Sequence, residues 1–372
     1  MMERKESTSK NWEIMKLGEI CEIRNGKDHK KVNTANGKYP IYGSGGIMGY
    51  ANEYLCPEGT TIIGRKGSIN KPLYVPCKFW NIDTAFGLVP RNNCEPRFLY
   101  YLCSSINFNK YNKSTTLPSL VKSELIKIPI PVPPLPVQAR IVDELDCLQG
   151  ILSKKRQQLA EYHSLAQAIF HQMFGDPVVN EKGWEVKRLG EVCELKSGFA
   201  FKSSLFKTEG LPILRISNIQ HDGISTNGLA FFAKEDYKED LEKYKVLPGD
   251  TLIALSGATT GKVGYNKIHE NFYLNQRVAI CREKHLCNRH FIFFILKEMS
   301  KHILEMAGGA AQPNISTKQI GLLTIPIPPL PLQQSFANRI AVINNQCESL
   351  NKSIHEMETL LATRMDMLLN ID

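Results

Sequence analysis

The amino-acid sequence predicts an α+β fold: two repeated α+β domains joined by two long helices that pair as an antiparallel coiled coil. Two observations carry this prediction. A proline-rich segment followed by a long helical pattern occurs twice, in residues 128–177 and from residue 325 onward. Motifs of the first half also recur in the same order in the second half. Together they indicate the order domain, helix, domain, helix.

The first long helix is expected between Gln138 and Phe174, a stretch with no proline and a single glycine, Gly150. Its apolar residues recur at spacings of three and four, which is the heptad pattern of a coiled-coil seam. The seam comprises Ile141, Leu145, Leu148, Leu152, Leu159, Tyr162, Ala166, Ile169 and Met173, with Lys155 as its one interruption. A helix of this length spans roughly 55 Å, so we expect it to act as a spacer.

The second long helix follows the proline-rich sequence IPIPPLPLQQ at residues 325–334. Its seam comprises Phe336, Ile340, Ile343, Cys347, Leu350, Ile354, Met357, Leu361 and Leu368, and Arg364 is the misfit. Because so narrow an apolar stripe suits a helical partner better than a sheet, we expect the two helices to pair. The alternative is that each helix packs separately on its own globular core.

The repeat defines the expected domains. WEIMKLGEIC from Trp12 matches WEVKRLGEVC from Trp184, and YPIY from Tyr39 matches LPIL from Leu211. LPSL at residues 117–120 likewise corresponds to QPNI at residues 312–315. We therefore predict a first recognition-type domain at 1–132, a central helix at 133–177, a second domain at 178–329 and a C-terminal helix at 330–372.

Inside the domains, the pattern predicts short strands at 59–64 and 250–255 and helices at 97–105 and 290–306. Residues 39–50 (YPIYGSGGIMGY) are rich in turn formers. Cys21 and Cys193 lie in the repeated motif and are expected in the core.

Composition limits the function. The chain has 372 residues, a net charge of +9 and a pI near 8.9, which moderately favours a polyanionic partner. Its ten cysteines form no CxxC pair and are expected to be reduced and mostly buried. No apolar run is long enough to span a membrane, and the polar start MMERKESTSKNW shows no signal peptide. We expect a cytoplasmic protein without a membrane partner.

Catalytic motifs are weak or missing. The segment SGATTGKV at 256–263 resembles a phosphate loop, but three residues separate its glycines and Val263 replaces the metal-holding hydroxyl. We find no methyltransferase tetrad, no nuclease-type carboxylate cluster and no histidine spacing for a metal. The two proline-rich segments before the long helices contain a PxxP pattern, which could bind an SH3-type domain. We call these segments the proline elbows, and they are better explained as stiff connectors to the helices. No catalytic residue and no metal site is predicted.

What remains is a set of polar, basic and aromatic loop residues. Arg, Asn and Gln suit base edges, whereas Lys, Ser and Thr suit phosphates; solvated or turn-capping roles are about equally compatible with each. In the first domain the candidates are Tyr42, Ser44, Arg65, Lys66, Ser68, Asn70, Lys71, Thr115, Thr116 and Lys122. In the second they are Arg215, Ser217, Asn218, Thr259, Thr260, Lys262, Asn275, Gln276, Arg277, Gln312, Asn314 and Lys318.

This arrangement resembles the specificity (S) subunit of type I restriction–modification enzymes over essentially the whole chain from Trp12. In the first half the resemblance is carried by WEIMKLGEI, YPIYGSGGIMGY, TIIGRKGSI and IPIPVPPLPVQARI. In the second it is carried by WEVKRLGEV, LPILRISNIQ, PGDTLIALSGATTGKVG, LNQRVAI, GGAAQPNIS and TIPIPPLPLQQ. Each motif alone is weak, but their order, found twice, is specific. The chain is at the short end for the family.

The resemblance implies two target-recognition domains that each read one half of a bipartite, asymmetric DNA site. It also implies that the helix pair docks two methyltransferase (M) subunits. S-adenosylmethionine would then be bound by those M subunits, and ATP and Mg²⁺ by restriction (R) subunits, with no cofactor in this chain. It implies a subunit that is not itself an enzyme.

Two other functions are compatible with the residues alone. One is a recognition module with its own nuclease activity, which would react with DNA in the presence of Mg²⁺. The other is a coiled-coil scaffold that binds no DNA at any salt concentration.

Overall fold

The computed structural model describes residues 12–114, 116–220, 223–268, 270–308 and 313–369. The chain divides into two compact units. Unit 1 consists of residues 1–157 and 351–372, and unit 2 of residues 158–350. Each of the two boundaries between the units, after residue 157 and after residue 350, lies inside a long helix. Each unit therefore contains one globular part and a segment of each long helix.

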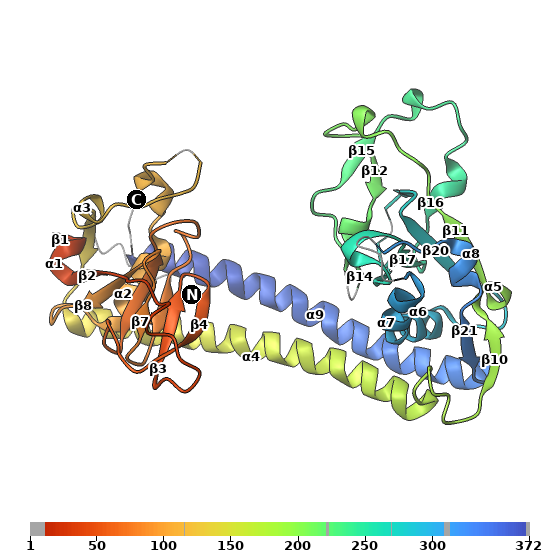
Figure 1. Cartoon of the computed structure of the whole chain (residues 1–372), viewed down its shortest axis with the longest axis horizontal. Helices are drawn as coiled ribbons and strands as arrows, with labels where there is room; N and C mark the ends of the chain where they lie inside the picture. Colours follow the sequence, from red (N-terminus) through yellow and green to blue (C-terminus); the bar gives the residue numbers. More distant parts are fainter. Residues whose placement is uncertain (1–11, 115, 221–222, 269, 309–312, 370–372) are drawn as a thin grey trace, which may run out of the picture. The chain divides into compact units, whose positions relative to one another are not determined.

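The described residues in the globular part of unit 1 form three sheets and several short helices (Figure 1). The main sheet has the order β2 (Cys21–Asn25), β8 (Ala85–Pro90), β5 (Thr60–Gly64) and β6 (Leu73–Val75), and all neighbours are antiparallel. A second sheet has the order β4 (Gly46–Ala51), β3 (Tyr39–Gly43) and β7 (Trp80–Asn81), with β3 and β7 parallel. The third is the antiparallel pair β1 (Glu13–Lys16) and β9 (Pro129–Val132). Helix α2 (Pro96–Ser105) contributes Phe98, Leu99 and Leu102 to the core.

Unit 2 repeats this topology with more strands. The sheet of β11 (Cys193–Ser197), β20 (Val278–Glu283), β17 (Thr251–Ala254) and β18 (Val263–Tyr265) corresponds to the main sheet of unit 1. The second sheet is β15 (Ala230–Phe232), β12 (Leu211–Leu214), β19 (Phe272–Leu274) and β16 (Lys245–Val246), again with one parallel pair, β12 and β19. The pair β10 (Glu185–Arg188) and β21 (Thr324–Ile327) corresponds to β1 and β9, and β13 (Ile219–Gln220) with β14 (Gly223–Ile224) is additional. The repeat read from the sequence is therefore a repeat of fold.

The turn-rich stretch 39–50 forms the hairpin of β3 and β4. One sequence prediction inside the domains needs correction. The single helix expected at 290–306 is two helices, α6 (Arg289–Glu298) and α7 (Ser300–Met306). They separate at Met299, whose ψ of 5° leaves the helical range. The predicted strands and the helix at 97–105 are confirmed within one residue or so at each end.

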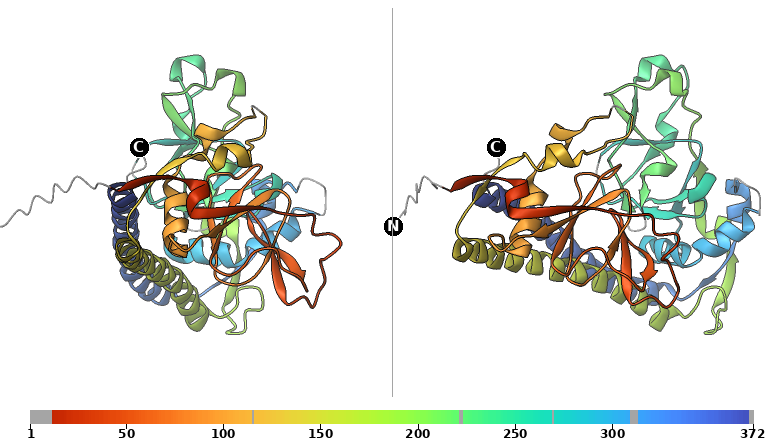
Figure 2. Two further views of the ribbon diagram at one scale, coloured as in Figure 1. Left: turned by 90° about the vertical axis from the view of Figure 1, so that its left-hand side faces the viewer. Right: turned by 60° about the vertical axis from the view of Figure 1, so that its left-hand side comes forward.

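The two long helices are α4 (Leu135–Phe174) and α9 (Leu330–Leu369), each of 40 residues. They run side by side in Figures 1 and 2. In unit 1, Glu144 near the start of α4 accepts a hydrogen bond from Arg364 near the end of α9. In unit 2 the order is reversed, because Phe170 near the end of α4 packs on Phe336 near the start of α9, with ring centroids 5.7 Å apart. The helices are therefore antiparallel, as the sequence predicts.

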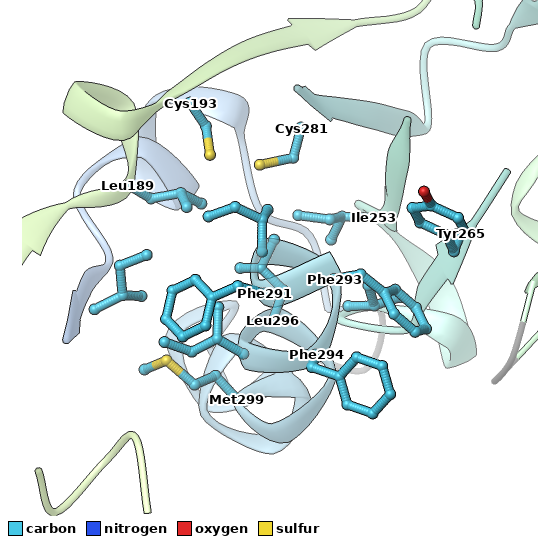
Figure 3. Close-up of a cluster of buried hydrophobic side chains, with 14 of the residues drawn as sticks. Leu189, Cys193, Ile253, Tyr265, Cys281, Phe291, Phe293, Phe294, Leu296 and Met299 are labelled. Carbon is cyan, nitrogen blue, oxygen red and sulfur yellow. The ribbon is translucent and has the colours of Figure 1, made fainter. Parts of the chain in front are cut away.

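In each unit, the segments of α4 and α9 that belong to that unit pack against its hydrophobic core. In unit 2, Phe170 and Phe174 of α4 pack against Phe291 of α6 and Phe336 of α9. Figure 3 shows the rest of this core, in which Phe291, Phe293 and Phe294 lie below the sheet residues Ile253 and Cys281. In unit 1, Leu369 is fully buried in the corresponding core, next to Leu361, Met365 and Leu368. The seam thus holds both the helix pair and the domain cores.

The cysteines follow the prediction. Cys21 and Cys193 are both 1% exposed, and of the ten free cysteines only Cys77 and Cys147 are exposed. Burial raises the pKa of the Cys21 thiol to about 12, so this side chain is an inert core group.

Candidate nucleic-acid interface

The same glycine turn follows the central strand of the main sheet in each unit. In unit 1, the N–H of Gly67 donates to Pro118 O at 2.9 Å, and in unit 2 the N–H of Gly257 donates to Pro313 O at 3.0 Å. The two glycines have φ of 80° and 78°, a left-handed conformation that only glycine adopts without strain. The pairing of LPSL with QPNI in the sequence is therefore a structural equivalence.

The turn is tied to the following segment by a second repeated bond. Leu120 N donates to Arg65 O at 2.9 Å in unit 1, and Ile315 N donates to Leu255 O at 2.9 Å in unit 2. An isolated bridge joins Lys66 to Ser119 in unit 1 and Ser256 to Asn314 in unit 2. The backbone frame is the same, whereas the side chains that it presents differ.

In unit 2 this frame borders an open cleft of about 670 Å³. The cleft is formed by the turn after β17, the loop before β20 and the segment that leads into α8 (Thr317–Gly321). Its polar lining includes Ser197, Ser256, Gln276, Arg277, Asn314, Ser316, Thr317 and Gln319. Of the residues predicted from sequence, the structure thus brings together Gln276, Arg277 and Asn314.

Three buried polar atoms beside this turn have no hydrogen-bond partner among the described residues. They are Ser256 Oγ, Thr259 Oγ1 and Arg215 Nε. Arg215 itself is fixed by a bond from Nη2 to Gly228 O at 3.0 Å and by its guanidinium over the Phe206 ring. Buried groups without partners are uncommon in folded proteins, and hydroxyl and guanidinium groups of this kind typically bind phosphate oxygens. Ser256 was missed in the sequence, although it opens the SGATTGK motif.

Two predicted residues have structural roles in unit 2 instead. Asn218 is fully buried, and its amide donates to Ser225 O at 3.1 Å and Asn227 O at 3.2 Å. Thr260 is 5% exposed and donates from Oγ1 to Gly257 O at 2.7 Å. Since these groups hold the loops themselves, we do not include Asn218 and Thr260 in the interface.

The other predicted residues of unit 2 lie around the cleft or apart from it. Asn275 caps the loop before β20 by accepting the N–H of Arg277 at 3.2 Å. Lys262 follows the glycine turn, with Nζ 3.5 Å from Gln220 Oε1. Ser217 and Lys318 are exposed, and Gln312 lies outside the described residues.

In unit 1 the predicted residues concentrate on the glycine turn. Arg65 lies over the Phe86 ring at 5.7 Å and also points Nη1 toward Asp83 O at 3.5 Å. Lys66 and Ser68, on either side of Gly67, are exposed. The turn therefore presents two cations and a hydroxyl to solvent.

The remaining candidates of unit 1 do not form one site. Tyr42 packs edge-on against Phe79 at 5.5 Å, and burial raises its pKa. Asn70 accepts the N–H of Phe108 at 2.8 Å and so supports a turn. Ser44 lies in the hairpin between β3 and β4 and is partly exposed. Lys71, Thr116 and Lys122 are exposed, and Thr115 lies outside the described residues.

Comparison with known proteins identifies the family. Residues 9–162 and 181–359 match the family described as "Type I restriction modification DNA specificity domain". The matched segments cover most of the chain and fall on both repeats.

The chain belongs to the type I restriction–modification specificity subunits.

Two relatives of this family come from Methanocaldococcus jannaschii. The type I restriction enzyme MjaVIII specificity subunit is 27% identical over 96% of this chain and 92% of its own length. The MjaIX specificity subunit is 25% identical over 91% of this chain and 89% of its own. Specificity subunits are the DNA-recognising, non-catalytic parts of type I enzymes, so the nuclease-fusion and scaffold alternatives are not favoured.

Solved structures support the same fold. The S subunit of a type I system from M. genitalium superposes with a TM-score of 0.62 at 18% identity, covering 98% of both chains. A second solved structure, which describes the complex assembly and conformational transition of the type I R-M system, gives a TM-score of 0.55. It is 20% identical and covers 96% of this chain and 97% of that one. Within the described residues, no group of three or more His, Cys, Asp or Glu side chains is arranged to hold a metal ion. Of the helices in those ranges, none combines the length and hydropathy needed to cross a bilayer.

Proposed function

We propose that this specificity subunit recognises a bipartite, asymmetric double-stranded DNA site, one half through each unit. The observation that carries the proposal is the repeated glycine turn, which has the same backbone bonds in both units but different side chains. Unit 1 has Arg65 and Lys66 where unit 2 has Leu255, which is buried, and Ser256. Equivalent frames with different base-facing groups would read different half-sites.

Within each frame we assign phosphate and base contacts by chemistry. In unit 2, Ser256 and Thr259 supply hydroxyls without partners, and Lys262 adds a nearby charge, so these three suit the DNA backbone. Gln276, Arg277 and Asn314 extend from the cleft lining and suit base edges. In unit 1 the exposed turn residues Lys66 and Ser68 would contact phosphate.

We further propose that the helix pair docks two methyltransferase subunits. The two long helices are 195 residues apart in the repeat, so Leu165 of α4 and Leu360 of α9 are equivalent positions. These leucines are 47% and 43% exposed, so the repeat places an apolar side chain that a partner could cover at the same position of each helix. One solved relative is described in terms of complex assembly, and two equivalent surfaces would accept two identical subunits.

The cofactors of the assembled enzyme would then lie outside this chain. We propose that S-adenosylmethionine is bound by the methyltransferase subunits and that ATP and Mg²⁺ are bound by restriction subunits in the cytoplasm. The purified chain, incubated with DNA, Mg²⁺ and S-adenosylmethionine, should therefore neither cut nor methylate the DNA.

The test of recognition is to express the chain with its methyltransferase subunit and to sequence methylated bases across the genome. The proposal predicts one motif with two short specified halves, different in sequence, separated by unspecified bases. A single continuous motif, or a palindrome, would contradict it. For docking, Leu165→Asp and Leu360→Asp should each reduce the methyltransferase content from two copies to one in native mass spectrometry. Ala160→Asp, at an exposed position on another face of α4, is the control.

A further inference from the structure

Asp83 in unit 1 and Gln276 in unit 2 occupy the same position of the repeated frame. Each precedes the last strand of its main sheet and lies between two residues whose backbone bonds are conserved between the units. The preceding residue (Ile82 or Asn275) donates its N–H to a strand of the second sheet. The following residue (Thr84 or Arg277) accepts the N–H of the residue at the start of the glycine turn. The bonds are Ile82 N to Tyr42 O at 3.0 Å, Asn275 N to Leu214 O at 3.0 Å, Arg65 N to Thr84 O at 2.8 Å and Leu255 N to Arg277 O at 2.8 Å.

The strands that follow confirm this register. Ala85 pairs with Gly64 in unit 1, and Val278 pairs with Ala254 in unit 2, in both cases at the end of the central strand. Thr84 is thus equivalent to Arg277, and Ile82 to Asn275. Since one residue separates the two positions in each unit, the alignment needs no insertion or deletion there. Asp83 is therefore the unit 1 counterpart of a residue that lines the cleft of unit 2.

The chemistry at this position differs between the units. Gln276 carries an amide with both a donor and an acceptor, whereas Asp83 carries a carboxylate that only accepts. Asp83 is exposed, and its carboxylate forms no hydrogen bond or ion pair with any described residue. Arg65 Nη1 is 3.5 Å from the Asp83 backbone carbonyl oxygen, but the carboxylate forms no ion pair with Arg65 or Lys66 among the described residues.

A free carboxylate at a DNA-facing position is repelled by phosphates, so it is costly there unless a base donor meets it. In the major groove, cytosine offers only its N4 amino donor, whereas adenine places the acceptor N7 beside its N6 amino group. A carboxylate therefore prefers cytosine, and an amide such as that of Gln276 prefers adenine.

We propose that Asp83 is a specificity-determining residue of unit 1, which selects a C·G pair in the first half-site by accepting a hydrogen bond from cytosine N4. Gln276 makes the corresponding contact in unit 2, with adenine as its preferred base. This assignment rests on the proposed function, because it requires that each unit reads one half-site through the repeated frame.

The test is to express Asp83→Asn with the methyltransferase subunit and to compare the methylated motif with that of the wild type. One C·G position of the first half-site should lose its preference by about ten-fold, or change to A·T, because an asparagine amide suits adenine. The second half-site should not change. Glu53→Gln removes the same charge from another exposed site of unit 1 and should leave both halves unaltered.

A reciprocal variant keeps the test independent of any one substitution. Gln276→Glu should shift one position of the second half-site toward cytosine and leave the first half-site intact. The inference is overturned if the wild-type motif is bipartite but neither Asp83→Asn nor Gln276→Glu alters its own half. It is also overturned if the first half-site contains no C·G pair. A wild-type motif that is not bipartite would instead refute the proposed function.

Discussion

Gln138 and Gln333 make the same three hydrogen bonds at the start of the two long helices. Each is fully buried. Each accepts the backbone N–H of the residue that caps the domain helix, Glu95 for α2 and Asn288 for α6, at 2.8 Å. Each also donates to a carbonyl of its own proline elbow, Pro133 O at 2.9 Å or Pro328 O at 2.8 Å. The third bond joins the helix to the loop before the domain helix. The two glutamines therefore fix the long helices to their domains.

Replacing this glutamine should destabilise the unit that it anchors. Gln333→Leu removes the partner of the buried Pro328 carbonyl and of the partly buried Asn288 N–H and Leu286 carbonyl. A buried group left unpaired costs about 1–3 kcal/mol. We expect a clearly lower thermal midpoint by calorimetry. Gln334→Leu, an exposed neighbour, should shift the midpoint little. Equal shifts for the two variants would show that Gln333 is not an anchor.

Arg364, the misfit in the apolar seam, is explained by its partner. Its hydrogen bond to Glu144 raises the pKa of the guanidinium and joins the two helices within unit 1. Arg364→Glu should lower the thermal midpoint through like-charge repulsion. The double variant Glu144→Arg with Arg364→Glu should recover most of the loss, because it restores the pair. A double variant no more stable than Arg364→Glu would mean that the pair does not contribute to helix register.

Lys262 and Arg277 should separate non-specific from specific DNA binding. Lys262→Ala removes a proposed phosphate contact, so the complex should bind all sequences more weakly and the salt dependence should flatten by about one unit of slope. Arg277→Ala should cost about 1–3 kcal/mol on the cognate site and relax one base pair. The Arg215 guanidinium donates to Gly228 O in the unbound chain. Arg215→Ala should show the same specific loss if the guanidinium exchanges this bond for one to a base when DNA binds. Titration of cognate and random duplexes at several salt concentrations distinguishes these outcomes, and equal losses on both duplexes would make the arginines phosphate contacts or structural groups.

A fragment of residues 1–180 should dimerise. It retains one domain and α4 but lacks α9, whose Met365 and Leu369 normally fill the core of unit 1. By the 195-residue repeat, Phe170 and Phe174 of α4 are their equivalents, so α4 of a second copy can supply them. Burial of each such side chain contributes about 1.5–3 kcal/mol.

Sedimentation at micromolar concentration checks the dimer. Phe170→Asp in the fragment should give a monomer, whereas Ala168→Asp, on the exposed face, should not. With the methyltransferase subunit, the dimeric fragment should methylate a palindrome of the first half-site. A fragment that stays monomeric without substitution would contradict the paired-helix account.

The sequence was sufficient for features that recur or repeat at a fixed period. The two seams predicted both long helices, and the order of motifs predicted the repeat of fold. It was insufficient where one residue acts through partners far away in the chain. Gln138 and Gln333 carry no periodic signal, and Phe170, the most buried residue at the end of α4, was outside the predicted seam. There the buried face of α4 contacts both α9, through Phe336, and the core of unit 2.

The candidate site shows the same limit. Residue types selected Gln276, Arg277 and Asn314, which the structure places along one cleft. They could not distinguish these residues from Asn218 and Thr260, whose polar groups form hydrogen bonds within the loops. Asp83 was not among the candidates, because its equivalence to Gln276 follows from backbone hydrogen bonds and not from sequence similarity. The predicted domain boundaries and DNA contacts themselves remain predictions.

The central claim is that each unit reads its own half of the DNA site. It is tested most directly by exchanging residues 28–125 for the equivalent segment of another family member and sequencing the methylated motif in cells. The exchanged segment contains the glycine turn and Asp83 but none of the long helices. The account predicts that one half-site is replaced while the other half-site is kept. An active complex in which both halves change, or in which neither changes, would contradict it.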